Sequence, residues 1–278
     1  MKTIIVCILL MLVINHSHAQ PYTLKSVGEA KEFRLKIYFG TRGKGAFVQY
    51  AGQKGILALS LKKYAVDSSE RKSGQPDFTT YVWDEIVNGK ITGSYGLTEG
   101  LREISDIWYW RKKDGKRFSL KDVEDKAPYT GSNKHLLHGV LLSFNHLNND
   151  QLNFDYPGGI KKTIQLPSYD SPDYVRQSNI IDYNFDGYDD VSFSIPDGGM
   201  GVYQIFNIWL YNPKIKRFEE LKEPDYTKSN CTGLCNVSVD RKPKLFLTSC
   251  RGAATWWQDV YRFGSNNKLV WIKSNKLN

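Results

Sequence analysis

The sequence predicts an all-β protein, in which an antiparallel β-meander forms an N-terminal module and a β-sandwich-like module follows it. Apolar residues recur in short, alternating runs separated by turn residues, which is the pattern of half-buried strands. Aromatic residues make up 13% of the chain, with seven Trp and 17 Tyr, and such rings fit pleated surfaces. Only 117–127 and 170–177 look helical, and both segments are short.

The first 19 residues have the composition of a secretory signal peptide. A basic start at Met1–Lys2 is followed by an almost wholly apolar run to Ile14, and 17–19 is a small-x-small cleavage site. The run is shorter than the roughly 20 residues that span a membrane, and no later segment is sufficiently apolar. We therefore expect cleavage near Ala19–Gln20, a periplasmic or secreted mature chain and no transmembrane segment.

The N-terminal module is expected to cover 20–122. Its strands are predicted at 33–40, 45–52, 55–62, 79–86, 89–96 and 102–110. Asn88-Gly89 and Asp114-Gly115 are signals for two-residue hairpin turns, since type I′ turns need positive φ at both central residues. The polar segment 123–135, which contains Pro128 and Gly131, is expected to be a linker.

The second module is expected to cover 136–278. Its strands are predicted at 138–146, 151–157, 161–167, 191–195, 202–211, 217–221, 243–249, 256–263 and 268–273. No internal repeat is apparent.

The predicted mature chain has three cysteines, Cys231, Cys235 and Cys250. An oxidising compartment permits a disulfide, and an odd number leaves one thiol over. We expect one bridge within this trio, and the sequence does not choose the pair. A zinc site is not expected, because all five histidines precede the cysteines.

An acidic loop from Asp182 to Asp190 has the pattern D-x-N-x-D-G-x-x-D. Ca²⁺ binds six to eight oxygens at about 2.3–2.6 Å, and EF-hand loops supply them at positions 1, 3, 5, 7 and 9. The flanks are strand-like and position 12 is Phe193, so a complete EF-hand is excluded. The alternative is a turn rich in Asp, Asn and Gly that binds nothing. The spacing favours calcium in a structural role, and the predicted ligands are Asp182, Asn184, Asp186, the Tyr188 carbonyl and Asp190.

Four segments resemble a family of secreted bacterial immunity proteins that act against peptidoglycan-cleaving toxins of type IV secretion. These segments are "NIIDYNFDGYDDVSF", "IWLYNPKIKRFEEL", "SCRGAATWWQDVYRF" and "NNKLVWI", and the resemblance covers roughly Asn179 to Ile272. The family is related in fold to periplasmic inhibitors of i-type lysozyme. The resemblance implies a lysozyme-inhibitor-like second module, and it implies that the acidic motif carries the calcium loop.

The resemblance also implies that a protruding loop plugs the cleft of a lysozyme-like enzyme. The segment that follows the predicted strand 191–195 is the candidate, although an ordinary Gly-rich hairpin connection fits it equally well. The residues of this inhibitor loop are Pro196, Asp197, Gly198, Gly199, Met200, Gly201 and Tyr203.

Other side-chain groups support weaker hypotheses. His135 and His138 lack a third metal ligand, so we expect surface or linker histidines. Arg251, Trp256 and Trp257 could form a platform for an acidic glycan, but core packing of one strand is the better interpretation.

The leading functional hypothesis is an exported, calcium-stabilised protein that binds and inhibits a peptidoglycan-cleaving enzyme. The alternative is an envelope glycan- or peptidoglycan-binding module, which the aromatic content and the formal charge of +9 would serve. Export argues against a nucleic-acid partner. A hydrolase is the third hypothesis, but there is no G-x-S-x-G motif and no distinctive carboxylate pair, so we do not expect an enzyme.

Overall fold

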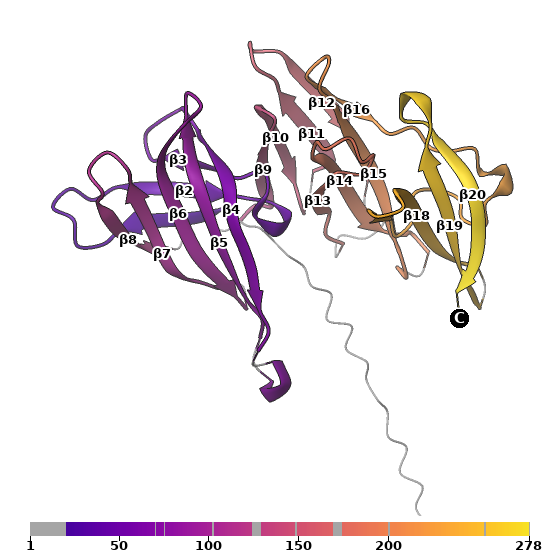
Figure 1. Ribbon diagram of the computed structural model, residues 1–278, viewed down its shortest axis with the longest axis horizontal. Coiled ribbons are helices and arrows are strands. Elements are labelled where there is room, and N and C mark those ends of the chain that lie inside the picture. The colour runs from indigo at the N-terminus through magenta and orange to yellow at the C-terminus, as the bar shows by residue number, and fades with distance from the viewer. Residues whose placement is uncertain are drawn as a thin grey trace, which may run out of the picture.

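The structure is a computed structural model that describes residues 21–69, 71–74, 76–101, 103–123, 129–147, 149–168, 174–199, 201–252 and 254–277. The predicted signal peptide and Met200 lie outside the described residues. The prediction of an all-β protein is confirmed, because every described element is a strand or a short 3-10 turn (Figure 1). Within the described residues, no helix is long and apolar enough to span a membrane.

The N-terminal meander closes into an eight-stranded antiparallel barrel, in which β8 pairs with β1. Its strands are β1 (Tyr22–Ser26), β2 (Arg34–Tyr38), β3 (Phe47–Tyr50), β4 (Leu57–Asp67), β5 (Phe78–Val87), β6 (Lys90–Gly100), β7 (Glu103–Arg111) and β8 (Arg117–Asp122). Trp83, Tyr95 and Phe39 are among the large side chains that fill its interior. The barrel is therefore a packed core.

Two sequence predictions about this module need correction. The segment 117–127 looked helical, but β8 is a strand whose Phe118 and Leu120 point into the barrel. Asn88 and Gly89 form the expected tight turn, with φ of 50° and 72°. The Asp114-Gly115 pair instead lies in a longer connection, between the end of β7 and the start of β8, where Asp114 accepts a hydrogen bond from the Arg111 side chain.

The rest of the chain forms three four-stranded antiparallel sheets, arranged one after another along the molecule (Figure 1). The first holds β9 (Ser132–Leu137), β10 (Val140–Asn145), β11 (Gln151–Asp155) and β12 (Lys161–Gln165). The second holds β13 (Gln177–Ile181), β14 (Asp190–Pro196), β15 (Gln204–Asn212) and β16 (Arg217–Glu220). The third holds β17 (Ser238–Asp240), β18 (Leu245–Gly252), β19 (Thr255–Phe263) and β20 (Leu269–Leu277).

The sheets pack face to face, with the second as the middle layer. Trp209 and Tyr211 of β15 pack toward the first sheet, whereas Ile208 and Leu210 pack with residues of the third. Because both faces of the middle sheet are covered, β15 reads as an almost continuous apolar run. This layering is sandwich-like, as expected, but with three sheets.

The barrel meets the first two sheets through residues 40–45, which we call the junction loop. The Gly45 carbonyl accepts a hydrogen bond from the Leu136 amide of β9 at 2.9 Å. The Thr41 hydroxyl donates to the Ser178 carbonyl of β13 at 3.1 Å, and Trp83 Nε1 holds the loop on the barrel through the Gly43 carbonyl. Strand β9 thus begins inside the segment predicted as a linker, where it docks on the barrel.

Candidate functional site

The acidic loop connects β13 to β14 in the middle sheet. Ile181 pairs with Asp190 at the base of this hairpin, so the two ends of the loop are fixed by the ladder. Gly187 has φ of +91°, and it makes the sharp turn that its place in the motif predicts. The predicted ligand residues are therefore gathered on one short connection.

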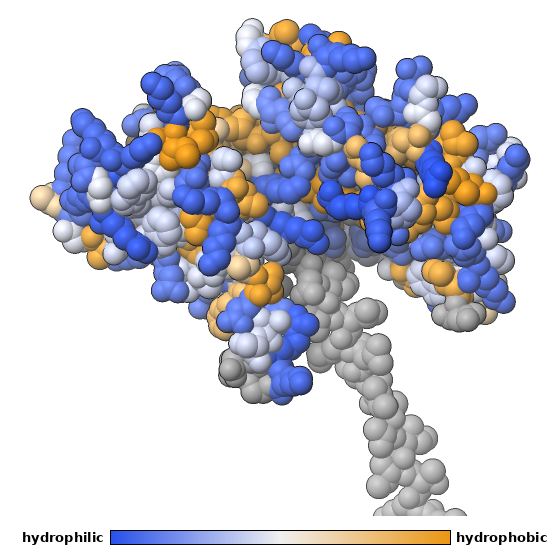
Figure 2. All heavy atoms as spheres, viewed as in Figure 1, coloured by the Kyte–Doolittle hydropathy of each residue, from blue (hydrophilic) through white to orange (hydrophobic). Residues whose placement is uncertain are grey.

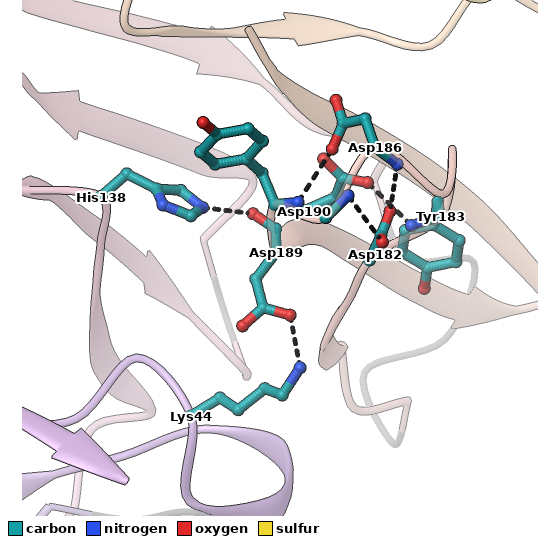
Figure 3. A network of polar contacts seen from close by, with 9 residues as sticks. Lys44, His138, Asp182, Tyr183, Asp186, Asp189 and Asp190 are labelled. Carbon is teal, nitrogen blue, oxygen red and sulfur yellow. Dashed lines mark hydrogen bonds and ion pairs between the residues drawn. The ribbon is translucent and has the colours of Figure 1, made fainter. Parts of the chain in front are cut away.

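Backbone amides of the loop donate to its own side chains. Asp182 accepts from the amides of Asp186 at 3.2 Å and Gly187 at 3.0 Å, one on each carboxylate oxygen. Asp186 in turn accepts from the Tyr188 amide at 2.9 Å (Figure 3). Each carboxylate oxygen has a second lone pair, so these bonds shape the loop without exhausting its acceptors.

Asp190 is the buried member of the group, with 0% of its surface exposed. One oxygen accepts from the Tyr183 amide and the other from the Tyr211 amide, both at 2.8 Å. Burial raises the pKa of Asp190 to about 8, and the charges of Asp186 and Asp182 push it in the same direction. A cation held by these carboxylates would act in the opposite direction and favour the ionised form.

Asp189 points away from the other acidic side chains and toward the barrel. Its carboxylate forms an ion pair with Lys44 of the junction loop, and its carbonyl contacts Nε2 of His138 at 2.7 Å (Figure 3). The His138 ring stacks on Tyr211 with centroids 4.0 Å apart. No local sequence pattern predicts this contact, because Lys44 and Asp189 are 145 residues apart along the chain.

The donor set fits a hard cation better than a soft one. The predicted ligands are carboxylate, amide and carbonyl oxygens, which suit Ca²⁺ and not Zn²⁺. The part of the chain that the structure describes contains no group of three or more His, Cys, Asp or Glu side chains arranged for a metal ion. A cation here would therefore depend on the Asn184 amide and the Tyr188 carbonyl as well as on the carboxylates.

The candidate inhibitor loop is the connection between β14 and β15, and Asp197 organises it. Asp197 accepts from the amides of Gly199 at 3.2 Å and Tyr203 at 3.0 Å, and its own amide donates to the Tyr203 carbonyl at 2.9 Å. Gly198 and Gly199 are exposed. Asp197 thus joins the two ends of this connection, and Gly198 and Gly199 are open to solvent.

Tyr203 packs against the cysteine cluster and is only partly exposed. The expected disulfide joins Cys231 to Cys250, and Cys235 is the free thiol. Cys235 is buried, which raises the pKa of its thiol to about 11. Tyr203 therefore has a structural contact as well as a place at the end of the loop.

The proposed glycan platform follows a β18–β19 pair. Arg251 lies opposite Trp256, and Cys250 lies opposite Trp257, whose ring packs on the cysteine cluster. Both Trp side chains are partly exposed. Core packing thus accounts for Trp257, and the three residues do not converge on one site.

The two histidines have different environments, and only that of His138 is the expected one. His135 is fully buried at the junction, where its Nε2 contacts the Ser178 hydroxyl at 3.0 Å. His138 is an exposed residue at the β9–β10 turn, with φ of +52° beside Gly139. The prediction of surface or linker histidines was wrong for His135, because its segment docks on the barrel.

No protein-family model matches this chain, and no curated protein matches it.

Proposed function

We propose that the protein is an exported, calcium-stabilised binding protein that inhibits a peptidoglycan-cleaving enzyme through the loop from Pro196 to Tyr203. The observation that carries the proposal is the direct connection between the two loops. Strand β14 runs from Asp190, the last predicted calcium ligand, to Pro196, the first loop residue. A binding loop that is ordered in advance loses less conformational entropy on association.

Calcium would be held by Asp182, Asn184, Asp186, Asp190 and the Tyr188 carbonyl. A bound cation supplies charge neutralisation for the clustered carboxylates. Asp190 also holds the base of the hairpin, since its carboxylate accepts hydrogen bonds from the amides of Tyr183 and of Tyr211 in the neighbouring strand.

The calcium part of the proposal predicts a calcium-dependent stability. A ligand that binds only the native state stabilises it by about 2.7 kcal/mol at a hundredfold excess over Kd. Calcium should therefore raise the melting temperature relative to chelator, and Asp186→Ala should abolish that rise. Asp189→Ala is the matched control, because this side chain faces Lys44 and should leave the calcium-dependent rise intact. Identical melting of the wild type with calcium and with chelator would remove calcium from the proposal.

The inhibitor part predicts a steric effect at the exposed glycines of the loop. Gly198→Trp adds bulk where the loop would enter a cleft, so it should reduce inhibition of a lysozyme by at least tenfold in a turbidity assay. Gly55→Trp is the control, because Gly55 is also exposed and a Cβ there meets nothing within 4 Å. Both variants should melt like the wild type. Full inhibition by Gly198→Trp would place the contact elsewhere.

A second candidate function is binding of an envelope glycan, in keeping with the formal charge of +9. A pull-down against a panel of lysozymes in parallel with insoluble peptidoglycan separates the two candidates. Retention by peptidoglycan without inhibition would favour the second.

A further inference from the structure

A basic hollow of about 420 Å³ lies against the acidic loop at Asn184 and Phe185. Its walls come from the loop itself, from the turn between β17 and β18, and from the end of β19. The residues that define it chemically are Phe185, Lys242, Lys244, Arg262 and Phe263.

The charged side chains of this hollow have one sign. Lys242, Lys244 and Arg262 are exposed and line the same space. Within the described residues, none of the three side chains forms an ion pair with a carboxylate, whereas Lys44 and Lys116 do. Three cations that gather without an anionic partner form a site of positive potential for an anion. The Arg262 guanidinium adds donors in a fork that matches carboxylate or phosphate oxygens.

Two aromatic rings complete the walls. The Phe185 and Phe263 rings meet edge to face at 6.4 Å, and Phe263 is itself held by Phe246 of the core at 5.7 Å. Both rings are partly exposed. Phe185 has φ of +64°, a left-handed conformation that is costly for a bulky residue. The fold therefore keeps this ring at the hollow against its local backbone preference.

We propose that this hollow binds an acidic sugar, with the anionic group on the cations and an apolar face of the ring on Phe185 and Phe263. Carboxylate and phosphate oxygens share the required chemistry, so either a uronic acid type of sugar or a sugar phosphate meets it. The proposed glycan platform brings only Arg251 and Trp256 to one position of the β18–β19 ladder, whereas three cations and two rings line the hollow. The inference does not depend on inhibition.

The test is an NMR titration of the intact mature protein with matched probes. Glucuronate and glucose 6-phosphate carry the charge on the same ring, and neutral glucose lacks it. We expect amide shifts at the hollow with one or both charged probes and none with glucose. Preference between the two charged probes identifies carboxylate or phosphate as the anion. Absence of shifts with both charged probes would overturn the proposal, and so would equal binding of glucose.

Three variants separate the cations from the rings. Lys244→Gln with Arg262→Gln should weaken binding at least tenfold without a change in melting temperature, because both side chains are exposed. Lys276→Gln, at an exposed lysine of β20, should bind like the wild type. Phe185→Asn removes the ring but keeps a residue that tolerates the left-handed conformation. This variant should bind the sugar probes more weakly than the wild type does, and it should bind inorganic phosphate with unchanged affinity. Unchanged binding by the double variant would show that the anion binds elsewhere. Equal affinity of the wild type for inorganic phosphate and glucose 6-phosphate would show that the rings do not contribute to binding.

Discussion

At the scale of single residues, His135 is the side chain whose environment departs most from its sequence context. Its ring packs between the junction loop and β13, so close to Gly40 that a Cβ added there would lie 3.0 Å from the ring carbon Cε1. Burial lowers its pKa to about 3, with a smaller contribution from His146. The folded protein therefore holds this imidazole neutral under all ordinary conditions.

Protonation of His135 is expected to destabilise the fold in acid. The unfolded chain takes up the proton near pH 6.5, whereas the folded chain does so only near pH 3, so the stability from this group is complete above pH 6.5 and is lost as the pH falls toward 3. At pH 5 the loss should be about 2 kcal/mol. Urea unfolding of the wild type and of a His135 variant, each at pH 7 and pH 5, measures this contribution as the difference between the two proteins.

The control for this effect is the other histidine of the pair. Between pH 7 and pH 5, the change in stability of His135→Gln should differ from that of the wild type by about 2 kcal/mol, whereas His138→Gln, at the exposed turn, should change as the wild type does. The raised pKa of Asp190 acts over the same range with the opposite sign, and it cancels in this comparison because all three proteins keep Asp190. If the free energy of unfolding changed equally between pH 7 and pH 5 in both variants, His135 would not be the group that governs acid stability.

The residues of the acidic loop were predictable because their spacing is local. Asp182, Asn184, Asp186 and Asp190 lie on one short connection between paired strands, and their calcium binding stays a prediction. The Lys44–Asp189 ion pair and the burial of His135 were not predictable, because they depend on how the barrel docks. Local patterns contain no information about such distant pairs.

At the scale of elements, the long connection between β16 and β17 is fastened to the third sheet. The Cys231–Cys250 disulfide ties it to β18. Buried Asp259 of β19 accepts from the amides of Asn230 and Cys231, the latter at 2.7 Å. The connection also carries the contact surface for Tyr203.

Loss of this disulfide should be costly. The bond closes a sequence separation of 19 residues, for which chain entropy gives about 3 kcal/mol. Cys231→Ser with Cys250→Ser should lower the free energy of unfolding by about that amount. Denaturant unfolding measures it, and reduction of the wild type should reproduce it. Cys235→Ser is the control that keeps the bond, and its sensitivity to reduction should remain.

Most strands were predictable from alternation and turn residues, and the failures have physical reasons. Strands β1 and β8 were not predicted, because both are short and polar on one face. They pair with each other, and this pairing closes the barrel. Strand β9 was missed because most of it lies in the polar segment predicted as a linker, where it pairs with β10 and hydrogen-bonds to the junction loop.

At the scale of the whole molecule, the junction loop couples the barrel to the sheets. Gly45 has φ of +62°, and a Cβ there would lie 3.1 Å from the His135 Cβ. Closure of the barrel and stacking of three sheets were not predictable, because register between distant strands is set by packing and not by local pattern.

Gly45→Ala should therefore weaken docking of the barrel on the sheets. The expected loss is about 2 kcal/mol, of which about 1 kcal/mol is backbone strain. Gly52→Ala is a matched control, since Gly52 has φ of +78° but a Cβ there meets nothing within 4 Å. Thermal unfolding compares the two. Equal destabilisation would show that the junction contact adds nothing to the backbone effect.

Open sheets carry a hazard that closed barrels avoid, because their edge strands expose backbone groups that can pair with another chain. The junction loop covers two such edges, since it hydrogen-bonds to Leu136 of β9 and to Ser178 of β13. The outer edges bear exposed charges instead, with Lys161 and Lys162 on β12, and Lys273 and Lys276 on β20. Figure 2 shows the visible face as largely hydrophilic, with apolar residues in small patches. We therefore expect the docked barrel to hinder pairing of other chains with β9 and β13, and the exposed lysines to hinder it at β12 and β20. Undocking of the barrel should consequently lead to fibrous or oligomeric species sooner than to a loosened monomer.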